Sequence, residues 1–127
     1  MKDYITEIKE VSKPVTAKEK IKLKDVSNAV SLDAKTQEEG KVIINPDYYA
    51  ILNVHNERSE DKEYTKYIVV DKDGTKYVTG SNSFFTSLID IMDDMTKEAP
   101  DEDYSIEVYR KESSNYKGKT FITCALV

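Results

Sequence analysis

The sequence has little of the material from which most enzyme centres are built. It contains no tryptophan, one histidine (His55) and one cysteine (Cys124). A Cys-His centre or a Ser-His-Asp triad would have to use His55, which has no recognisable nucleophile motif around it. The Cys-x-x-Cys and His-Glu-x-x-His spacings of zinc sites are absent, as are the glycine-rich loops that cradle phosphates. We therefore expect no enzymatic activity, no metal and no cofactor, and a protein that acts by binding a partner.

Long apolar runs are missing as well. No stretch approaches the roughly 20 residues that cross a bilayer, and the N-terminal MKDYITEIKE carries acidic residues where a signal peptide is apolar. The single cysteine cannot form an internal disulfide, which fits a reducing compartment. These absences predict a cytoplasmic protein without a membrane partner, located in the host cytoplasm if the chain is viral.

The length allows one domain. With 127 residues, of which 39% are hydrophobic and 34% charged, the chain can bury a core of its own without disulfides or metals. We expect a single domain over residues 1–127. Residues 1–16 have only short apolar spacing before Pro14, which allows a weak helix or strand, and this segment could be flexible or loosely packed.

Most of the remaining pattern predicts β-strands. Runs of β-branched and aromatic residues mark 41–44, 48–55, 64–70, 76–79, 104–110 and 119–127 as strands. Residues 36–40 are predicted to form a turn, and Asp73 and Gly74 can supply the positive φ angles of a tight hairpin.

One helix is predicted after Gly80, with Ser81 or Ser83 as its cap. Its apolar stripe consists of Phe84, Phe85, Leu88, Ile89, Ile91, Met92 and Met95. Acidic residues lie on the other face, so this helix should pack on a sheet and not along a nucleic-acid backbone. About five or six strands with one amphipathic helix packed on them favour a mainly β (α+β) fold, a small antiparallel barrel.

The net charge of −5 is unevenly distributed along the chain. Residues 17–24 carry four lysines and one glutamate, and residues 110–119 carry four basic residues and one glutamate, so each segment has a net charge of +3. Residues 90–103 carry seven acidic residues and one lysine, a net charge of −6. Binding of phosphates needs local positive potential, which the basic segments supply, although such segments are also common on ordinary solvated surfaces.

Aromatic and basic residues near one another are the strongest functional signal. Single-stranded nucleic acid is held by bases that stack on aromatic rings while Lys and Arg contact the phosphates. Tyr116 is the best candidate ring, because it lies in a predicted hairpin loop where burial is difficult. The candidate phosphate contacts are Arg110, Lys111, Lys117 and Lys119, and the further candidate binding residues are Tyr49, Tyr67, Lys76, Tyr77, Tyr109 and Phe121. Each of these aromatic residues could instead fill the core.

Three segments form a combination found in a known group of proteins. They are the sequence KYVTGS at 76–81, a helix that opens with Phe84-Phe85, and the ending SSNYKGKTFITC at 113–124. With these segments the chain resembles small single-stranded DNA-binding proteins from phages and mobile elements of low-GC Gram-positive bacteria. The resemblance covers roughly residues 48–127, and the first 40 residues do not contribute to it. It implies an OB-like barrel, a role in replication or recombination, and no catalysis.

Two functions therefore remain open. The leading hypothesis is a single-stranded DNA-binding protein that supports phage or mobile-element replication or recombination. The alternative is a small acidic protein-interaction module or an inhibitor of a host protein, in which acidic residues imitate a phosphate backbone; the candidates for this partner-binding surface are Asp93, Asp94, Asp101 and Asp103. The same acidic helix region could contact a host or replication protein in a DNA-binding protein, and self-association as a homo-oligomer also stays open.

Overall fold

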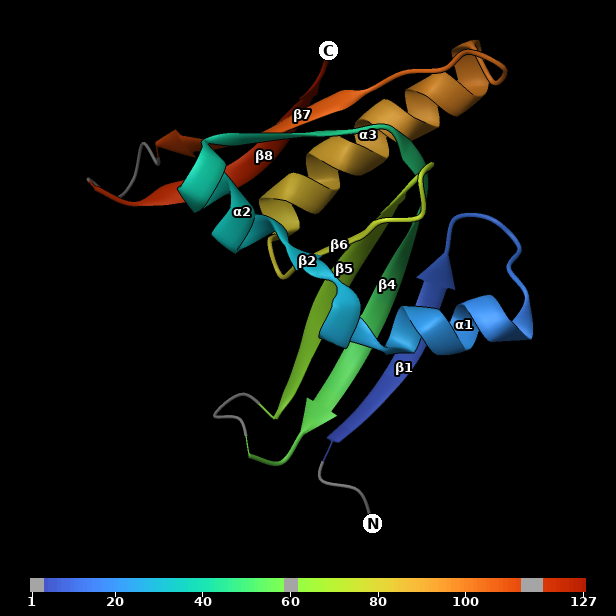
Figure 1. Ribbon diagram of the computed structural model, residues 1–127, viewed down its shortest axis with the longest axis vertical. Coiled ribbons are helices and arrows are strands. Elements are labelled where there is room, and N and C mark those ends of the chain that lie inside the picture. The colour runs from blue at the N-terminus through green and yellow to red at the C-terminus, as the bar shows by residue number, and fades with distance from the viewer. Residues whose placement is uncertain (1–3, 59–61, 113–117) are drawn as a thin grey trace. The chain divides into compact units, whose positions relative to one another are not determined.

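The computed structural model describes residues 4–58, 62–112 and 118–127 (Figure 1). Within these ranges the elements follow one another as β1 (Tyr4–Val11), α1 (Ala17–Lys24), a short 3-10 helix η1 (Val26–Asn28), β2 (Val30–Ser31), α2 (Leu32–Glu39), β3 (Lys41–Ile44), β4 (Pro46–Asn56), β5 (Glu63–Asp71), β6 (Lys76–Thr79), α3 (Asn82–Glu98), β7 (Ile106–Glu112) and β8 (Thr120–Leu126). The predicted mainly β fold with an amphipathic helix is confirmed. The described strands form two sheets, in the orders β1-β4-β5-β6-β2 and β3-β7-β8, and do not close into one barrel.

The chain divides into two compact units. The first comprises residues 1–30 and 47–80, and the second comprises residues 31–46 and 81–127. Each unit is described by itself below. The expectation that residues 1–127 act as a single domain stays a prediction.

The first unit contains a sheet with one buried face. Burial alternates along β4, so that Tyr48, Ala50 and Leu52 point to the same side. These side chains form one core cluster with Leu23, Ile68 and Val70. Leu23 belongs to α1, and this helix therefore covers the buried face of the sheet.

The N-terminal segment is part of this sheet. β1 pairs antiparallel with β4, with Ile8 opposite Leu52, and Ile8 packs against the core cluster. The pairing shifts register between Ile8 and Glu10, which places a β-bulge at Lys9. Of the two structures that the sequence allowed before Pro14, the strand is the one observed.

The turn between β5 and β6 confirms the predicted hairpin but not its backbone detail. Gly74 has a φ of 95°, whereas no residue other than glycine has a positive φ among the described residues, so the prediction for Asp73 is wrong. The N–H of Gly74 donates to the carbonyl of Asp71, and the N–H of Asp71 donates to the carbonyl of Thr75. This is a three-residue loop with a glycine in the left-handed conformation, in which the Asp73 side chain accepts the N–H of Thr75 at 2.8 Å.

The second unit packs α3 beside the three-stranded sheet. Ile106 and Val108 of β7 and Ile122 of β8 are buried on one face of the sheet, and Phe84 and Leu88 of α3 are buried as well. Helix α3 begins after Ser81, whose Oγ accepts the N–H of Phe84, as predicted for the cap. A hydrogen bond from Ser83 Oγ to the carbonyl of Ile122, at 3.0 Å, joins α3 to β8.

Two short helices were not expected from the sequence. Helix α1 starts with a capping box in which Thr16 and Glu19 each accept the other's N–H. Helix α2 occupies the segment predicted as the turn 36–40, and that prediction is wrong. The helix ends at Gly40, which has a φ of 83° and donates its N–H to the carbonyl of Thr36.

In the part of the chain that the structure describes, no helix is long and apolar enough to cross a membrane.

Candidate nucleic-acid interface

Three predicted binding residues share one face of the five-stranded sheet. Because Tyr48 and Ile68 point into the core, their neighbours Tyr49 and Tyr67 lie on the opposite face. Tyr77 belongs to the same face, since it pairs with Val69 while Val78 pairs with Ile68. All three tyrosines are half-buried. We call Tyr49, Tyr67 and Tyr77 the tyrosine face.

The tyrosine face is not an open aromatic surface throughout. Val69 and Thr79 lie on the same side of the sheet and are buried, with exposures of 0% and 3%. Tyr67 and Tyr77 are diagonal neighbours across β5 and β6, at a spacing that allows aromatic rings to touch. The register thus places these two residues at diagonal positions on one face, while Tyr49 lies on the neighbouring strand β4.

The far end of β4 carries the chain's only histidine. His55 lies on the side of the tyrosine face, with its Nε2 2.6 Å from Glu57 Oε1 and its Nδ1 3.3 Å from Glu63 Oε1. The hydrogen bond with Glu57 is the main reason that the pKa of His55 is raised above its usual value of 6.5. This end of the face is acidic, because Glu7 and Glu63 line a cavity of about 280 Å³ together with His55. We therefore do not assign it to phosphate binding.

A second aromatic surface lies on the outer face of the three-stranded sheet. Lys111 is directly opposite Phe121, and Tyr109 is opposite Thr123 two pairs further along, on the same side of the sheet. On the other side of Tyr109, β3 places Lys41 opposite it. These residues point away from the buried face, because Val108, Ile122 and Cys124 alternate with them in the core. We call Lys41, Tyr109, Lys111 and Phe121 the hairpin face.

The hairpin face combines an exposed ring, Phe121, and a half-buried one, Tyr109, with basic side chains. Phe121 is 36% exposed and Ile43, which follows Lys41 on the same side of β3, is 50% exposed. Lys41 is partly neutralised, since its Nζ lies 3.4 Å from Glu107 Oε1. Lys111 has no ion pair with any of the described residues, so its charge is available to a ligand. The arrangement offers a ring for a base beside a cation for a phosphate.

Arg110 lies on the opposite side of the sheet from Lys111. Its Nε donates to Thr36 Oγ1 at 3.1 Å, one Nη to Thr120 Oγ1 at 2.9 Å, and the other Nη to the carbonyl of Asp33 at 2.8 Å. These bonds hold α2 against β7 and β8. The structure therefore does not bring the Arg110 guanidinium to the hairpin face.

Lys76 is also separated from the rings near it in sequence. It pairs with Val70 on the core side of the sheet, whereas Tyr77 points to the other side. Its ammonium donates to the carbonyls of Lys22 and Asp25, where α1 ends. Lys76 thus compensates the negative end of the α1 dipole in this structure.

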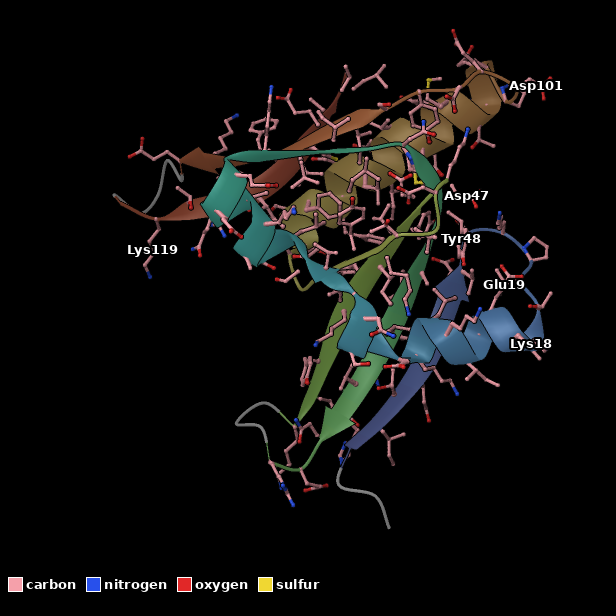
Figure 2. The ribbon with its side chains drawn as sticks, in the orientation of Figure 1. Lys18, Glu19, Asp47, Tyr48, Asp101 and Lys119 are labelled. Atoms are coloured by element: carbon pink, nitrogen blue, oxygen red, sulfur yellow. The ribbon has the colours of Figure 1, made fainter. Side chains whose placement is uncertain are left out.

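The loop that was the centre of the predicted site is only partly described. Tyr116 and Lys117 lie outside the described residues, and their proposed contacts stay predictions. Lys119 is exposed and extends near the start of β8, at the same end of the hairpin as Lys111 (Figure 2).

The acidic residues predicted as a partner surface are all exposed. Asp93 and Asp94 lie on α3, and Asp101 and Asp103 lie between α3 and β7. Asp103 accepts a hydrogen bond from the side-chain amide of Asn45 at 3.2 Å.

No group of three or more potential metal ligands occurs among the residues covered by the structure.

Cys124 has the role of a small core residue. It is 7% exposed, and its Sγ lies 3.9 Å from the carbonyl oxygen of Phe84. Burial raises the pKa of its thiol to about 12, so the reactive thiolate is scarce at neutral pH. This confirms that Cys124 packs in the core.

Aromatic rings beside lysines on a β-sheet face are the arrangement by which proteins hold single-stranded nucleic acid. The family model described as Phage Single-stranded DNA-binding protein matches residues 5–127, and the chain belongs to this family. No curated protein and no solved structure matches the chain. The match includes residues 5–40, a segment that did not contribute to the resemblance.

The family confirms the phage part of the resemblance and single-stranded DNA as the ligand. A Gram-positive host stays a prediction. Lys41 and Ile43, which lie on the outer side of the three-stranded sheet, were not among the predicted binding residues. The alternation in Lys41–Ile44 already indicates that these two residues share one face.

Proposed function

We propose that this protein coats single-stranded DNA, without catalysis, during phage DNA replication or recombination in the host cytoplasm. We further propose that the hairpin face is the main contact with the bases. One observation supports this most strongly: Phe121 is exposed, is directly opposite Lys111, which forms no ion pair with the described residues, and has Tyr109 as its diagonal neighbour. A base stacked on Phe121 would have its phosphate within reach of the Lys111 side chain.

The burial of the two surfaces favours the hairpin face over the tyrosine face as the main contact. Phe121 and Lys111 are both exposed, whereas the tyrosine face is interrupted by the buried Val69 and Thr79. Stacking of one base on an aromatic side chain contributes about 1–3 kcal/mol and is tolerant of sequence. We propose that the tyrosines add further stacking positions and that the protein has little preference for particular bases.

The proposal is tested with Phe121→Ala in a binding titration of fluorescent oligothymidine. Loss of one stacked base should weaken binding by about 5- to 150-fold. Leu126→Ala is the matched control, because Leu126 is an exposed apolar residue of the same strand, 52% exposed, that belongs to the other side of the sheet. Equal affinities of the Phe121 variant, the Leu126 variant and the wild type would contradict the assignment of the hairpin face.

A further inference from the structure

Helix α1 carries the basic segment 17–24, which the proposed function does not use. Leu23 is the one buried residue of this helix, and Lys18, Lys20, Lys22 and Lys24 are all exposed. None of the four forms an ion pair with another described residue. Glu19, the only acidic residue of the helix, is engaged in the capping box with Thr16. The positive charge of α1 is therefore not used inside the first unit.

The four lysines form two pairs on different sides of the helix. Lys20 and Lys24 are four residues apart and lie on one side, and Lys18 and Lys22 lie on another. Figure 1 shows α1 lying across β1 in the first unit, which is the edge strand of the five-stranded sheet. Lys20 and Lys24 point to this edge, because both line the groove between α1 and β1.

Two adjoining hollows make up this groove. One has a volume of about 510 Å³ and is lined by residues 7–11 of β1 together with Lys20 and Lys24. The other has a volume of about 490 Å³ and is lined by residues 11–15 and Lys20. Val11 and Lys20 belong to both hollows, so the groove is continuous along the edge of the sheet.

Four lysines and two glutamates line the groove. Lys20 and Lys24 come from α1, and the others come from β1 and the segment after it. Lys9, Lys20 and Lys24 form no ion pair with another described residue. Lys13 does, since its Nζ lies 2.9 Å from Asp47 Oδ1. Glu7 and Glu10 line the groove from β1. Their partners across the sheet, Asn53 and Ile51, belong to the face opposite the core, whereas Lys20 and Lys24 reach the groove from α1.

The other side of α1 is a poor place for an anion. Lys22 lines a cavity of about 410 Å³ in which four carboxylates gather, from Glu19, Asp25, Asp47 and Asp71. Glu19, Asp47 and Tyr48 are seen in this region in Figure 2. Although Lys72 and Lys76 line the same cavity, the Lys76 ammonium is already bound by two backbone carbonyls. A phosphate chain would meet less repulsion in the groove than in this cavity.

We propose that the groove between α1 and β1 is a second binding site for the DNA strand, where Lys9, Lys20 and Lys24 contact its phosphates. This inference rests on the proposed function and adds a contact that no predicted site residue includes. β4, which carries Tyr49, is the direct neighbour of β1, so a strand that leaves the tyrosine face over the sheet edge reaches the groove. Because no aromatic residue is among the described residues that line the two hollows, the groove is a contact for phosphates and not for stacked bases.

The experiment compares two double variants of the same helix. Lys20→Ala/Lys24→Ala removes the groove pair, and Lys18→Ala/Lys22→Ala removes the same charge from the other side. Both replace exposed lysines by alanine, which has the higher helix propensity, so both variants should fold. Binding of a long oligothymidine, about 30 nucleotides, and of a short one, about 8 nucleotides, is titrated at several salt concentrations.

For the long oligonucleotide, loss of the groove pair should reduce the slope of log K against log salt by about 1.4, which is about 0.7 for each phosphate contact. The loss of affinity between about 50 and 200 mM salt then becomes about sevenfold smaller than for the wild type. The Lys18/Lys22 variant should keep a slope close to that of the wild type. The short oligonucleotide, which should occupy the hairpin face alone, should bind both variants with equal affinity.

Three outcomes would overturn the second site while leaving the proposed function intact. In the first, both double variants reduce the slope of log K against log salt by the same amount, which would indicate a diffuse positive field around α1. A second outcome is that neither variant changes the slope, which would leave α1 outside the DNA contact and available to an acidic protein surface. The short oligonucleotide could be affected as much as the long one, which would place the lysines at the main site. Failure of the wild type to bind either oligonucleotide would instead contradict the proposed function.

Discussion

At the scale of single residues, neighbours in the sequence have different tasks because strands alternate. Arg110 and Lys111 are adjacent basic residues, and both were predicted to contact phosphates. The structure directs the Arg110 side chain to Thr36, Thr120 and the carbonyl of Asp33, and directs Lys111 to the face of Phe121. Charge and aromatic content indicated the right segment, but the side of each residue depends on the strand register.

The burial of Cys124 leads to a prediction about its reactivity. Since its pKa is raised to about 12, a thiol reagent such as a maleimide should not modify the folded protein at pH 7.5 and should modify it fully in denaturant. Mass spectrometry before and after addition of urea checks this. Rapid modification of the folded protein would show that the thiol is accessible and that its surroundings differ from those described.

His55 should make the stability of the protein depend on pH. Its folded-state pKa is raised above 6.5, mainly by the hydrogen bond with Glu57, so its stabilising contribution is complete below 6.5 and is lost as pH rises through the raised value. The difference in Tm between the wild type and His55→Gln should thus be larger at about pH 6 than at about pH 8. Thermal unfolding across this range measures it. The same difference at all pH values would mean that the contacts with Glu57 and Glu63 do not stabilise the protonated ring.

At the scale of elements, the second unit depends on how α2 is fixed to the sheet. Arg110 of β7 joins them, because its guanidinium donates two hydrogen bonds to α2 and one to Thr120 of β8. Thr36, one of its partners, is 2% exposed. The guanidinium is thus part of the structure of this unit.

Arg110→Ala should accordingly lower the free energy of unfolding by about 1.5–3 kcal/mol, the range for hydrogen bonds that involve a charged group. Lys111→Ala, the adjacent exposed residue, should change it by less than about 0.5 kcal/mol. Urea denaturation of the two variants measures both values. If Arg110→Ala kept full stability and instead weakened DNA binding as Lys111→Ala does, the guanidinium would have to be reassigned to the phosphates.

The elements with a clear pattern were predictable, and the short helices were not. The strands β3 to β8 and the helix α3 are seen in the sequence because alternation or an apolar stripe extends over many residues. Helices α1 and α2 have eight residues each and bury very few of them, Leu23 in α1 and Leu32 and Thr36 in α2. No apolar stripe can arise from so few buried positions, and only the caps at Thr16, Ser31 and Gly40 gave a signal.

At the scale of the whole molecule, the acidic net charge is compatible with DNA binding because the charges are segregated. The lysines of the hairpin face and of the α1 groove lie away from the exposed acidic residues of α3 in the sequence, and phosphate contacts depend on local potential. The net charge of −5 still lowers non-specific attraction to polyanions. We therefore expect modest affinity at high salt and strong dependence on salt.

The candidate site was predictable in its chemistry but not in its extent. Lys111 and Phe121 were predicted and lie opposite each other, which the spacing of a hairpin permits. The groove beside α1 could not be foreseen, because it requires that α1 be a helix and that β1 be the edge strand. Both facts come from pairings between residues far apart in the sequence, such as Ile8 with Leu52.

The central claim is that DNA is held by stacked bases together with lysine–phosphate contacts that include Lys111. Its most direct test is a titration of fluorescent oligothymidine with the wild type and with Lys111→Ala at salt concentrations from about 50 to 300 mM. We expect the wild type to bind at about 50 mM salt with log K falling linearly with log salt, and Lys111→Ala to reduce that slope by about 0.7. No binding at about 50 mM salt, or the same slope for both proteins, would contradict the account.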